Sequence, residues 1–127
     1  CLASFSDARL ARLRAAAGPS LLTAMGPRSV LGLWTRAAIP HLPLPVHGTF
    51  AQVPTGYGPL TVVCRRLIGL AHRRRAEVHV WTIDTAAEMH RLLDMGVDGL
   101  VSDEPALLRE VLRERGQWAQ APDSDSA

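Results

Sequence analysis

The sequence contains no lysine and few aromatic residues. All 14 basic residues are arginines, and aromatic side chains make up only 5% of the 127 residues. A nucleic-acid-binding domain usually shows a dense basic stripe with aromatic residues inside it. Here the arginines are spread along the chain, apart from the run at residues 73–75. The composition therefore argues against a nucleic-acid-binding protein.

Cysteine is also scarce, and no segment is typical of membrane insertion or export. Cys1 and Cys64 fit neither a metal-ligand spacing nor a dense disulfide framework, which favours two free thiols in a reducing compartment. No apolar run approaches the ~20 residues needed to span a bilayer, and no basic region precedes an apolar one as in a signal peptide. We therefore expect a cytoplasmic protein. Because the chain opens within a stretch typical of a strand end, we also expect that a preceding part, with any leader, is missing.

Hydrophobic residues make up 47% of the chain, which is enough for the core of one domain. Short apolar segments alternate with amphipathic ones. Strands are predicted over residues 1–5, 20–26, 49–54, 78–83 and 99–103, and helices over residues 7–17, 29–38, 62–75, 86–95 and 104–115. This alternation indicates an α/β protein whose parallel sheet has right-handed crossovers. A doubly wound open sheet and part of a (β/α) barrel both fit, and periodicity does not separate them.

The predicted helices begin with residues that can accept hydrogen bonds from free backbone N–H groups. These caps are Ser6 with Asp7, Thr61, Thr85 with Glu88 as a capping box, and Asp103. Residues 39–48 and 55–59 are rich in Pro or Gly and are predicted to be loops. Residues 117–127 are polar and are predicted to be a disordered tail.

Polar and aromatic residues gather where the predicted strands end, which is the ligand-binding edge in either architecture. Ser6, Asp84 and Asp103 each precede a helix, so capping explains them without a function. Trp81 is a large indole at a strand end, and it fits a core position or the wall of a ligand pocket equally well. The five histidines form no pair with metal-ligand spacing. The sequence therefore predicts a pocket rim without a paired acid and base.

The segment VHVWTIDTAAEMHRLLDMGVDGLVSDEP resembles the closing segment of the glycerophosphodiester phosphodiesterase family. Several short motifs carry this resemblance in the family's order and spacing. They are Ser-Phe at residues 4–5, Ala-His at 71–72, Trp-Thr at 81–82, Gly-Val-Asp-Gly at 96–99 and Ser-Asp-Glu-Pro at 102–105. This sequence departs from the family at Asp84, often Asn, at Ser102, often Thr, and near Arg75, where Gly is common. A left-handed non-Gly residue at this last helix end would cost ~1 kcal/mol.

The resemblance implies a partial (β/α)₈ TIM barrel over residues 1–116, running from the end of strand 4 through helix 8. It also implies metal-assisted hydrolysis of a glycerophosphodiester to sn-glycerol 3-phosphate and an alcohol. The family's catalytic histidines and its carboxylate ligands for Ca²⁺ or Mg²⁺ lie on the first strands, and none of their motifs occurs here. No catalytic or metal-binding residue is therefore assigned. Phe5 and Trp81 are expected to line the glycerol side of the substrate pocket.

These expectations describe a fragment that is inactive alone, because its mechanism would need an acid, a base and metal ligands. Its partner in the complete enzyme would be the small-molecule glycerophosphodiester, with no nucleic acid and no membrane span. The open edges of a partial sheet would favour self-association. The alternative is a non-enzymatic truncated barrel that serves as a self-associating or partner-binding module.

Overall fold

The computed structural model describes residues 1–18, 20–39 and 44–118, which form five helices and five short strands. The elements in chain order are α1 (Asp7–Ala17), α2 (Pro27–Ala38), β1 (Phe50–Val53), β2 (Gly56–Tyr57), β3 (Leu60–Thr61), α3 (Arg65–Arg73), β4 (Glu77–Val80), α4 (Ala86–Met95), β5 (Gly99–Leu100) and α5 (Pro105–Glu114). None of the helices in these ranges is long and apolar enough to cross a membrane.

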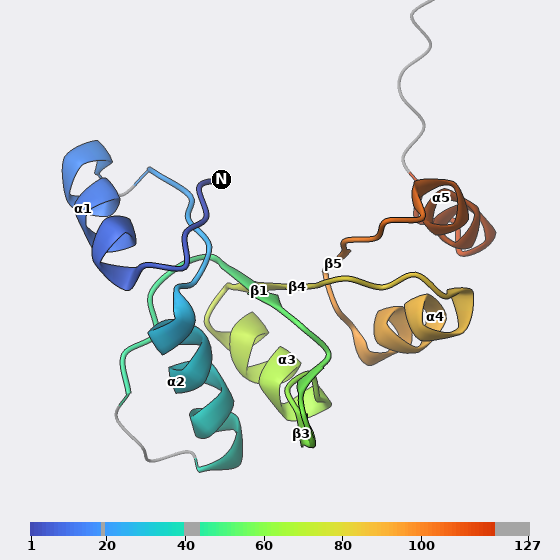
Figure 1. The fold of residues 1–127 in the computed structure, drawn as a ribbon, viewed down its shortest axis with the longest axis horizontal. Helices are drawn as coiled ribbons and strands as arrows, with labels where there is room; N and C mark the ends of the chain where they lie inside the picture. Colours follow the sequence, from blue (N-terminus) through green and yellow to red (C-terminus); the bar gives the residue numbers. More distant parts are fainter. Residues whose placement is uncertain (19, 40–43, 119–127) are drawn as a thin grey trace, which may run out of the picture.

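The main sheet is parallel, and its strands follow one another in chain order. β1 pairs with β4 and β4 pairs with β5. Single parallel bridges, Leu2 to Thr23 and Ala24 to Phe50, extend this order toward the N-terminus. Figure 1 shows α1 to α5 following each other around an arc, with the strands on its inner side. A doubly wound sheet would reverse its strand order and cover both faces, so the arrangement is a sector of a barrel.

Several predicted strand boundaries are wrong. The predicted strands at 1–5 and 20–26 are reduced to the single bridges, and the strands at 78–83 and 99–103 leave the sheet after Val80 and Leu100. Apolar composition marked these segments, but only part of each finds a strand partner. The predicted loop at 55–59 lies instead in an antiparallel hairpin of β2 and β3. Gly58 allows its tight turn because it has a φ of 58°.

The helix caps are partly as predicted. Ser6 precedes α1, and its hydroxyl accepts from the backbone N–H of Arg9 at 3.4 Å. Thr61 was a wrong assignment, because it lies in β3 and the next helix begins only at Arg65. Asp103 was also wrong, since Glu104 occupies the N-cap position of α5. The β2–β3 hairpin takes up the predicted cap residue Thr61, and residues 62–64 of the predicted helix lie before α3.

The capping box at α4 has the predicted position without the predicted bonds. Thr85 is the N-cap residue but makes no side-chain cap hydrogen bond. Glu88 does not reach back to it, because its carboxylate accepts from Arg91 Nε at 2.8 Å. This hydrogen bond lowers the pKa of Glu88 and raises the pKa of Arg91. An exposed charged partner one turn ahead therefore competes successfully for the Glu88 side chain.

The end of α3 confirms the expected left-handed residue. Arg75 has a φ of 57°, the one positive φ of a non-Gly residue in the ranges that the structure describes. Its N–H donates to the carbonyl oxygen of His72 at 2.9 Å, so the conformation closes the last turn before β4. Arg75 thus takes the place of a glycine at this helix end.

The core lies between the sheet and the helices. Ala51 and Val53 in β1 and Val78 and Val80 in β4 are fully buried against the helix layer. Alternate residues point to the other side of a strand. Phe50, Gln52 and His79 on that side are only partly buried, and we call this side the inner face. The sequence pattern therefore produces one covered face and one open face.

The predicted tail boundary at residue 116 remains a prediction. Gln117 and Trp118 follow two residues after the end of α5, and their N–H groups donate to the carbonyl oxygen of Leu112 at 2.8 and 3.2 Å. Residues 119–127 of the predicted tail lie outside the described residues.

Candidate functional site

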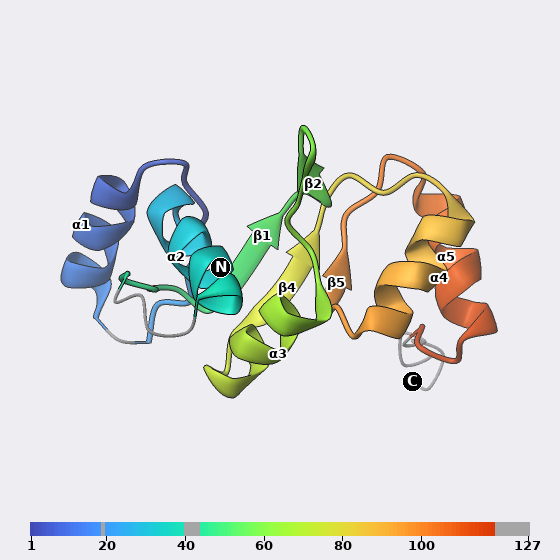
Figure 2. The same ribbon diagram turned by 90° about the horizontal axis from the view of Figure 1, so that it is seen from below.

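The carboxyl ends of the parallel strands form one edge of the molecule. Figure 2 shows that the β2–β3 hairpin and the loops after β4 and β5 all leave the sheet on this side. The loop after β4 carries Trp81, Thr82 and Asp84, and the loop after β5 carries Ser102 and Asp103. In barrels this edge holds the active site, so it is the candidate site here.

Asp84 joins the two loops. Its Oδ1 accepts from the Ser102 hydroxyl at 3.0 Å and from the Asp103 backbone N–H at 2.9 Å. The Ser102 hydroxyl oxygen in turn accepts from the Glu104 N–H at 3.0 Å. The predicted capping role of Asp84 is therefore wrong, because its carboxylate satisfies donors of the next loop and none of its own helix. The asparagine and threonine that the family often has at these two positions would keep the same acceptor oxygen and the same hydroxyl.

Trp81 lies at the end of β4 and is 37% exposed. Its backbone N–H donates to the Val53 carbonyl at 3.1 Å, which fixes the start of the loop to β1. The indole belongs neither to the buried core nor to the partly buried residues packed against it within the described ranges. Its exposed ring is therefore free to contact a ligand, and the substrate-binding role remains a prediction.

Phe5 lies in the loop that leads into α1 and is 88% exposed. The loop is ordered by its serines, since the Ser6 N–H donates to the Ser4 hydroxyl at 3.1 Å. The Leu2 bridge and β4 are separated in the sheet by the segment of residues 23–24 and by β1. Neighbouring strands lie ~4.8 Å apart, so three steps place the two loops ~14 Å apart along the sheet. Phe5 and Trp81 therefore belong to opposite sides of this edge.

The described residues do not fit a divalent cation. They contain no group of three or more His, Cys, Asp or Glu side chains that could hold a metal ion. At the candidate site, Asp84 already accepts two hydrogen bonds through one oxygen. Ca²⁺ takes about six to eight oxygen ligands and Mg²⁺ about six. The few carboxylates at this edge cannot provide such a set.

The histidines lie away from the candidate site. Three of them approach carboxylates: His72 with Asp98 at 2.8 Å, His79 with Glu77 at 3.0 Å and His90 with Glu114 at 3.6 Å. His47 is exposed in the loop before β1, and His41 lies outside the described residues. Among the described residues, no histidine is thus available at this edge as an acid or base.

The Gly-Val-Asp-Gly motif at 96–99 has a structural role that the sequence did not reveal. Asp98 Oδ2 accepts from the Val78 N–H and from His72 Nε2, each at 2.8 Å. Its own N–H donates to the Val78 carbonyl at 2.9 Å. Asp98 therefore fastens the amino end of β5 to β4. The Ala-His motif takes part in the same contact, so two segments of the resemblance meet here.

Gly99 in this motif makes room for a neighbouring ring. A Cβ atom at Gly99 would lie 2.8 Å from His79 Cδ2, which is closer than real contacts allow. The His79 ring packs on the inner face with Phe50, at a centroid distance of 5.3 Å. The glycine is thus required by close side-chain packing across the β4–β5 pair.

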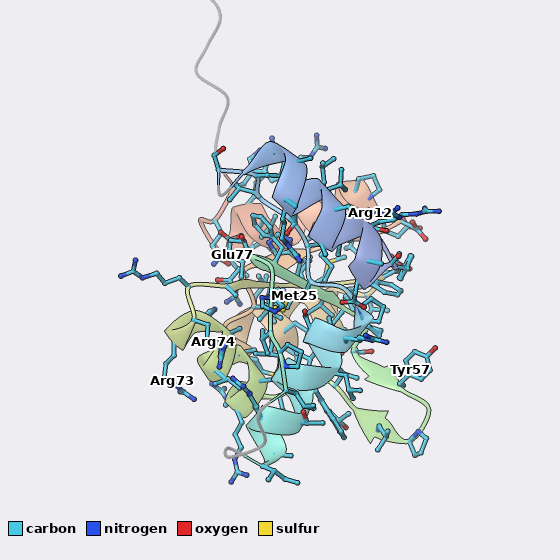
Figure 3. The ribbon with its side chains drawn as sticks, turned by 90° about the vertical axis from the view of Figure 1, so that its left-hand side faces the viewer. Arg12, Met25, Tyr57, Arg73, Arg74 and Glu77 are labelled. Carbon is cyan, nitrogen blue, oxygen red and sulfur yellow. The ribbon has the colours of Figure 1, made fainter. Side chains whose placement is uncertain are left out.

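Sequence reasoning missed one exposed aromatic residue at the site edge. Tyr57 lies in the β2–β3 hairpin after β1 and is 77% exposed. Figure 3 shows its side chain projecting from the hairpin. Gly58 and Pro59 are typical of a tight turn. A hairpin predicted around this turn would have placed Tyr57 on this side.

Comparison with known proteins decides the family. Residues 2–107 match the model of the glycerophosphoryl diester phosphodiesterase family. The chain belongs to this family. The resemblance seen in the short motifs is therefore confirmed, and it extends over most of the barrel sector.

The chain is similar to two curated members of the family. Probable glycerophosphodiester phosphodiesterase 2 of Mycobacterium tuberculosis is 42% identical over 67 residues, which cover 53% of this chain and 25% of that protein. Glycerophosphodiester phosphodiesterase GDPD4 of Arabidopsis thaliana is 34% identical over 64 residues, which cover 50% of this chain and 19% of that protein.

A solved structure supports the fold. The crystal structure of a putative glycerophosphoryl diester phosphodiesterase from Silicibacter pomeroyi superposes with a TM-score of 0.64 at 22% identity, over 90% of this chain and 37% of that chain. With the sequential parallel sheet, it confirms the predicted partial (β/α)₈ barrel. This glycerophosphoryl diester phosphodiesterase family member spans a quarter or less of the curated relatives it matches.

Proposed function

We propose that this chain forms part of the barrel of an enzyme that hydrolyses glycerophosphodiesters to sn-glycerol 3-phosphate and an alcohol. The family match over residues 2–107 carries the proposal. The parallel sheet adds support, because it presents an aromatic and polar edge at the carboxyl ends of its strands, where barrel enzymes bind substrate. We place the complete enzyme in the cytoplasm, which cell fractionation would test.

The proposed contribution of this chain is one wall of the substrate pocket. Trp81 offers an exposed apolar ring beside the polar loop that Asp84 holds in place. An indole can cover the carbon backbone of glycerol while its N–H donates to a hydroxyl. Phe5 would act on the opposite side of the same edge. Neither ring supplies a proton or a nucleophile, so both are substrate-binding residues in this proposal.

The reaction itself would need groups beyond the described residues of this chain. The described residues combine no histidine with a second acid or base at the site, and they hold no metal-ligand set. We propose that the divalent cation expected for the family is bound elsewhere in the complete enzyme. Ca²⁺ or Mg²⁺ should then leave the melting temperature of this chain unchanged, whereas clear stabilisation by either ion would contradict the proposal.

Activity can be tested in two arms. The purified chain should not hydrolyse glycerophosphocholine in the presence of Ca²⁺ or Mg²⁺, and robust turnover would overturn its assignment as an inactive part. A chimera of the Mycobacterium tuberculosis relative, in which the barrel region equivalent to residues 2–107 is replaced by those residues of this chain, should hydrolyse the substrate. A folded but inactive chimera would contradict the proposed function.

The role of Trp81 can be measured in the active chimera. Trp81→Ala should raise KM for glycerophosphocholine with a smaller change in kcat, because the ring is proposed to bind the substrate and to take no part in proton transfer. Leu31→Ala on α2 is a matched control, since Leu31 is also a large exposed apolar residue. Equal KM and kcat values for wild type and Trp81→Ala would contradict a substrate-binding role for Trp81.

A second candidate function is a self-associating or partner-binding module. The observation in its favour is the open inner face together with exposed apolar residues near the sheet edges, including Leu2 at 44% and Val101 at 48% exposure. Size-exclusion chromatography with light scattering separates the two. A stable, monodisperse dimer would favour the module, whereas an inactive monomer or aggregate would favour part of an enzyme.

A further inference from the structure

The charges of the chain are strongly segregated. Residues 8–76 contain ten of the 14 arginines and none of the 12 acidic residues. Helices α2 and α3 lie within this range and pack against each other. No acidic side chain on either helix can therefore neutralise their arginines, and a local positive potential results.

A groove between α2 and α3 concentrates this charge. It has a volume of about 530 Å³, and small residues such as Ala38 and Gly69 form part of its lining. Five arginines also line it: Arg36, Arg65, Arg66, Arg73 and Arg74. A groove of this size is within the range of ligand sites, and its small residues let a ligand approach the helices closely.

Most of these guanidinium groups make few hydrogen bonds or ion pairs with the described part of the chain. The side chains of Arg66, Arg73 and Arg74 make no hydrogen bond or ion pair within the described part of the chain, and all three residues are exposed. Arg65 donates only to the carbonyl oxygen of Asp94, at 3.4 Å. Their charge is thus available to an external anion.

Several acidic residues of the C-terminal part are already paired within the chain and are not available to a second copy. Glu88 pairs with Arg91 and Asp94 pairs with Arg115, with the latter atoms 2.8 Å apart. Asp98 is occupied by the Val78 N–H and by His72. Part of the negative charge is therefore satisfied internally, whereas Arg66, Arg73 and Arg74 have no such partner in the described part of the chain.

We propose that the α2–α3 groove binds a ligand carrying at least two phosphate groups. The planar guanidinium fork matches phosphate oxygens in two-point contacts. Arg65 and Arg66 lie at the amino end of α3, whereas Arg73 and Arg74 lie at its carboxyl end. Eight residues of helix separate the two pairs by ~12 Å. A ligand with phosphate groups spread over this length can contact both groups of arginines at once. Among the described residues, no aromatic side chain lines the groove, so base stacking from them would not contribute.

The groove is separate from the candidate site. Figure 3 shows Arg73 and Arg74 at the opposite end of the molecule from Tyr57, which marks the side where the strands end. The ligand would therefore bind on the outside of the barrel and would not be the hydrolysed substrate. The same chemistry is offered by a soluble polyphosphate and by neighbouring headgroups of anionic lipids.

The test measures binding of two probes to the full chain. Inositol hexakisphosphate represents the soluble source, and vesicles of phosphatidylcholine with phosphatidylglycerol represent the lipid source. Arg73→Gln with Arg74→Gln should weaken binding about tenfold or more, because charge-assisted hydrogen bonds are lost. Arg109→Gln with Arg113→Gln on α5 is the control, because it removes the same charge from exposed residues outside the groove. Its affinity for the probes should stay within about twofold of the wild-type value.

Four further measurements make the outcome decisive. Inorganic phosphate should bind at least about tenfold more weakly than inositol hexakisphosphate, since it offers far fewer oxygens and charges to the arginines. Arg73→Lys with Arg74→Lys should bind with intermediate affinity, and circular dichroism should show all variants folded. Hydrogen exchange should slow in α2 and α3 when ligand is added.

Binding to the soluble probe alone would assign a soluble ligand, and added binding to anionic but not neutral vesicles would assign a lipid surface. If neither probe bound to the chain, the proposal would be overturned. Equal losses in the groove variant and the α5 control, or a preference for an oligonucleotide over both probes, would also overturn it. Because none of these readings depends on hydrolysis, the outcome is independent of the proposed function.

Discussion

Replacement of Asp98 is the sharpest test of how β5 is held. One oxygen of this carboxylate accepts from the backbone N–H of Val78 and from His72, each at 2.8 Å. Val78 is fully buried, whereas the side chains of His72 and Asp98 are 43% and 30% exposed. The two contacts should therefore differ in their contribution to the free energy of unfolding.

The structure sets an order for three variants. Asp98→Ala leaves the buried Val78 N–H without its acceptor, which costs ~1–3 kcal/mol, and it also removes the exposed pair, which contributes up to ~1 kcal/mol. We expect a total loss of ~2–3 kcal/mol. Asp98→Asn keeps a carbonyl acceptor for Val78 and should lose only the contribution of the charge. His72→Ala should likewise cost no more than ~1 kcal/mol.

Urea denaturation measures these differences. For a small domain a loss of this size lowers the midpoint by ~1–2 M, because the denaturant slope is ~1–3 kcal/mol per M. Exchange of the Val78 amide hydrogen gives a local readout, which Asp98→Ala should accelerate far more than His72→Ala. If His72→Ala proved as destabilising as Asp98→Ala, the exposed pair and not the buried N–H would dominate, and the reasoning would fail.

Three other predictions test separate contacts. Asp84→Ala should cost ~1 kcal/mol and speed exchange of the Asp103 amide, whereas Asp84→Asn should not, because it keeps the acceptor. Arg75→Gly should stabilise the chain by up to ~1 kcal/mol in thermal denaturation, since glycine tolerates the positive φ of 57°. Because Arg91 lowers the pKa of Glu88, this pair stabilises the fold above the ordinary Glu value of ~4.3, and that stability is lost as the pH falls through the lower folded-state pKa. Glu88→Gln should therefore cost ~0.3–0.5 kcal/mol at pH 7 and nothing once Glu88 is protonated in both states.

Each of these has its own contrary result. Equal exchange rates in the Ala and Asn variants at position 84 would show that the oxygen is not the acceptor that matters. Arg75→Ala is the control for the helix end, because it removes the charge but keeps the strained conformation. If Arg75→Ala stabilised the chain as much as Arg75→Gly, the gain would come from removal of the charge and not from relief of the backbone conformation. A pH-independent effect of Glu88→Gln would contradict the ion-pair account.

The strand–helix order could be predicted from the sequence because local composition determines it. Val78 and Val80 alternate with polar neighbours in a short β-branched run, and Gly96 ends α4 in the left-handed conformation. Strand lengths could not be predicted in the same way. Residues 1–5 are apolar enough for a strand, but only Leu2 pairs with a neighbouring segment. Strand formation depends on a partner, and partners are distant in the sequence.

The site was predictable in position but not in its contacts. The rule for carboxyl ends of parallel strands placed Trp81 and Asp84 at one edge. The role of Asp84 was assigned to its own helix, because capping is a local interaction that sequence spacing reveals. Its actual donors belong to residues 102 and 103 in the next loop. Such contacts follow from the register of β4 and β5, which spacing alone does not specify.

The motifs that carry the family resemblance therefore have a structural explanation. β4 and β5 pair over only two residues each, His79 with Gly99 and Val80 with Leu100. So short a ladder provides few hydrogen bonds, and a carboxylate strengthens it at each end: Asp98 before β5 and Asp84 after β4. These residues preserve the barrel whether or not a reaction occurs in it. A match in this region consequently demonstrates the fold and the family, while activity must be tested where an acid, a base and metal ligands come together.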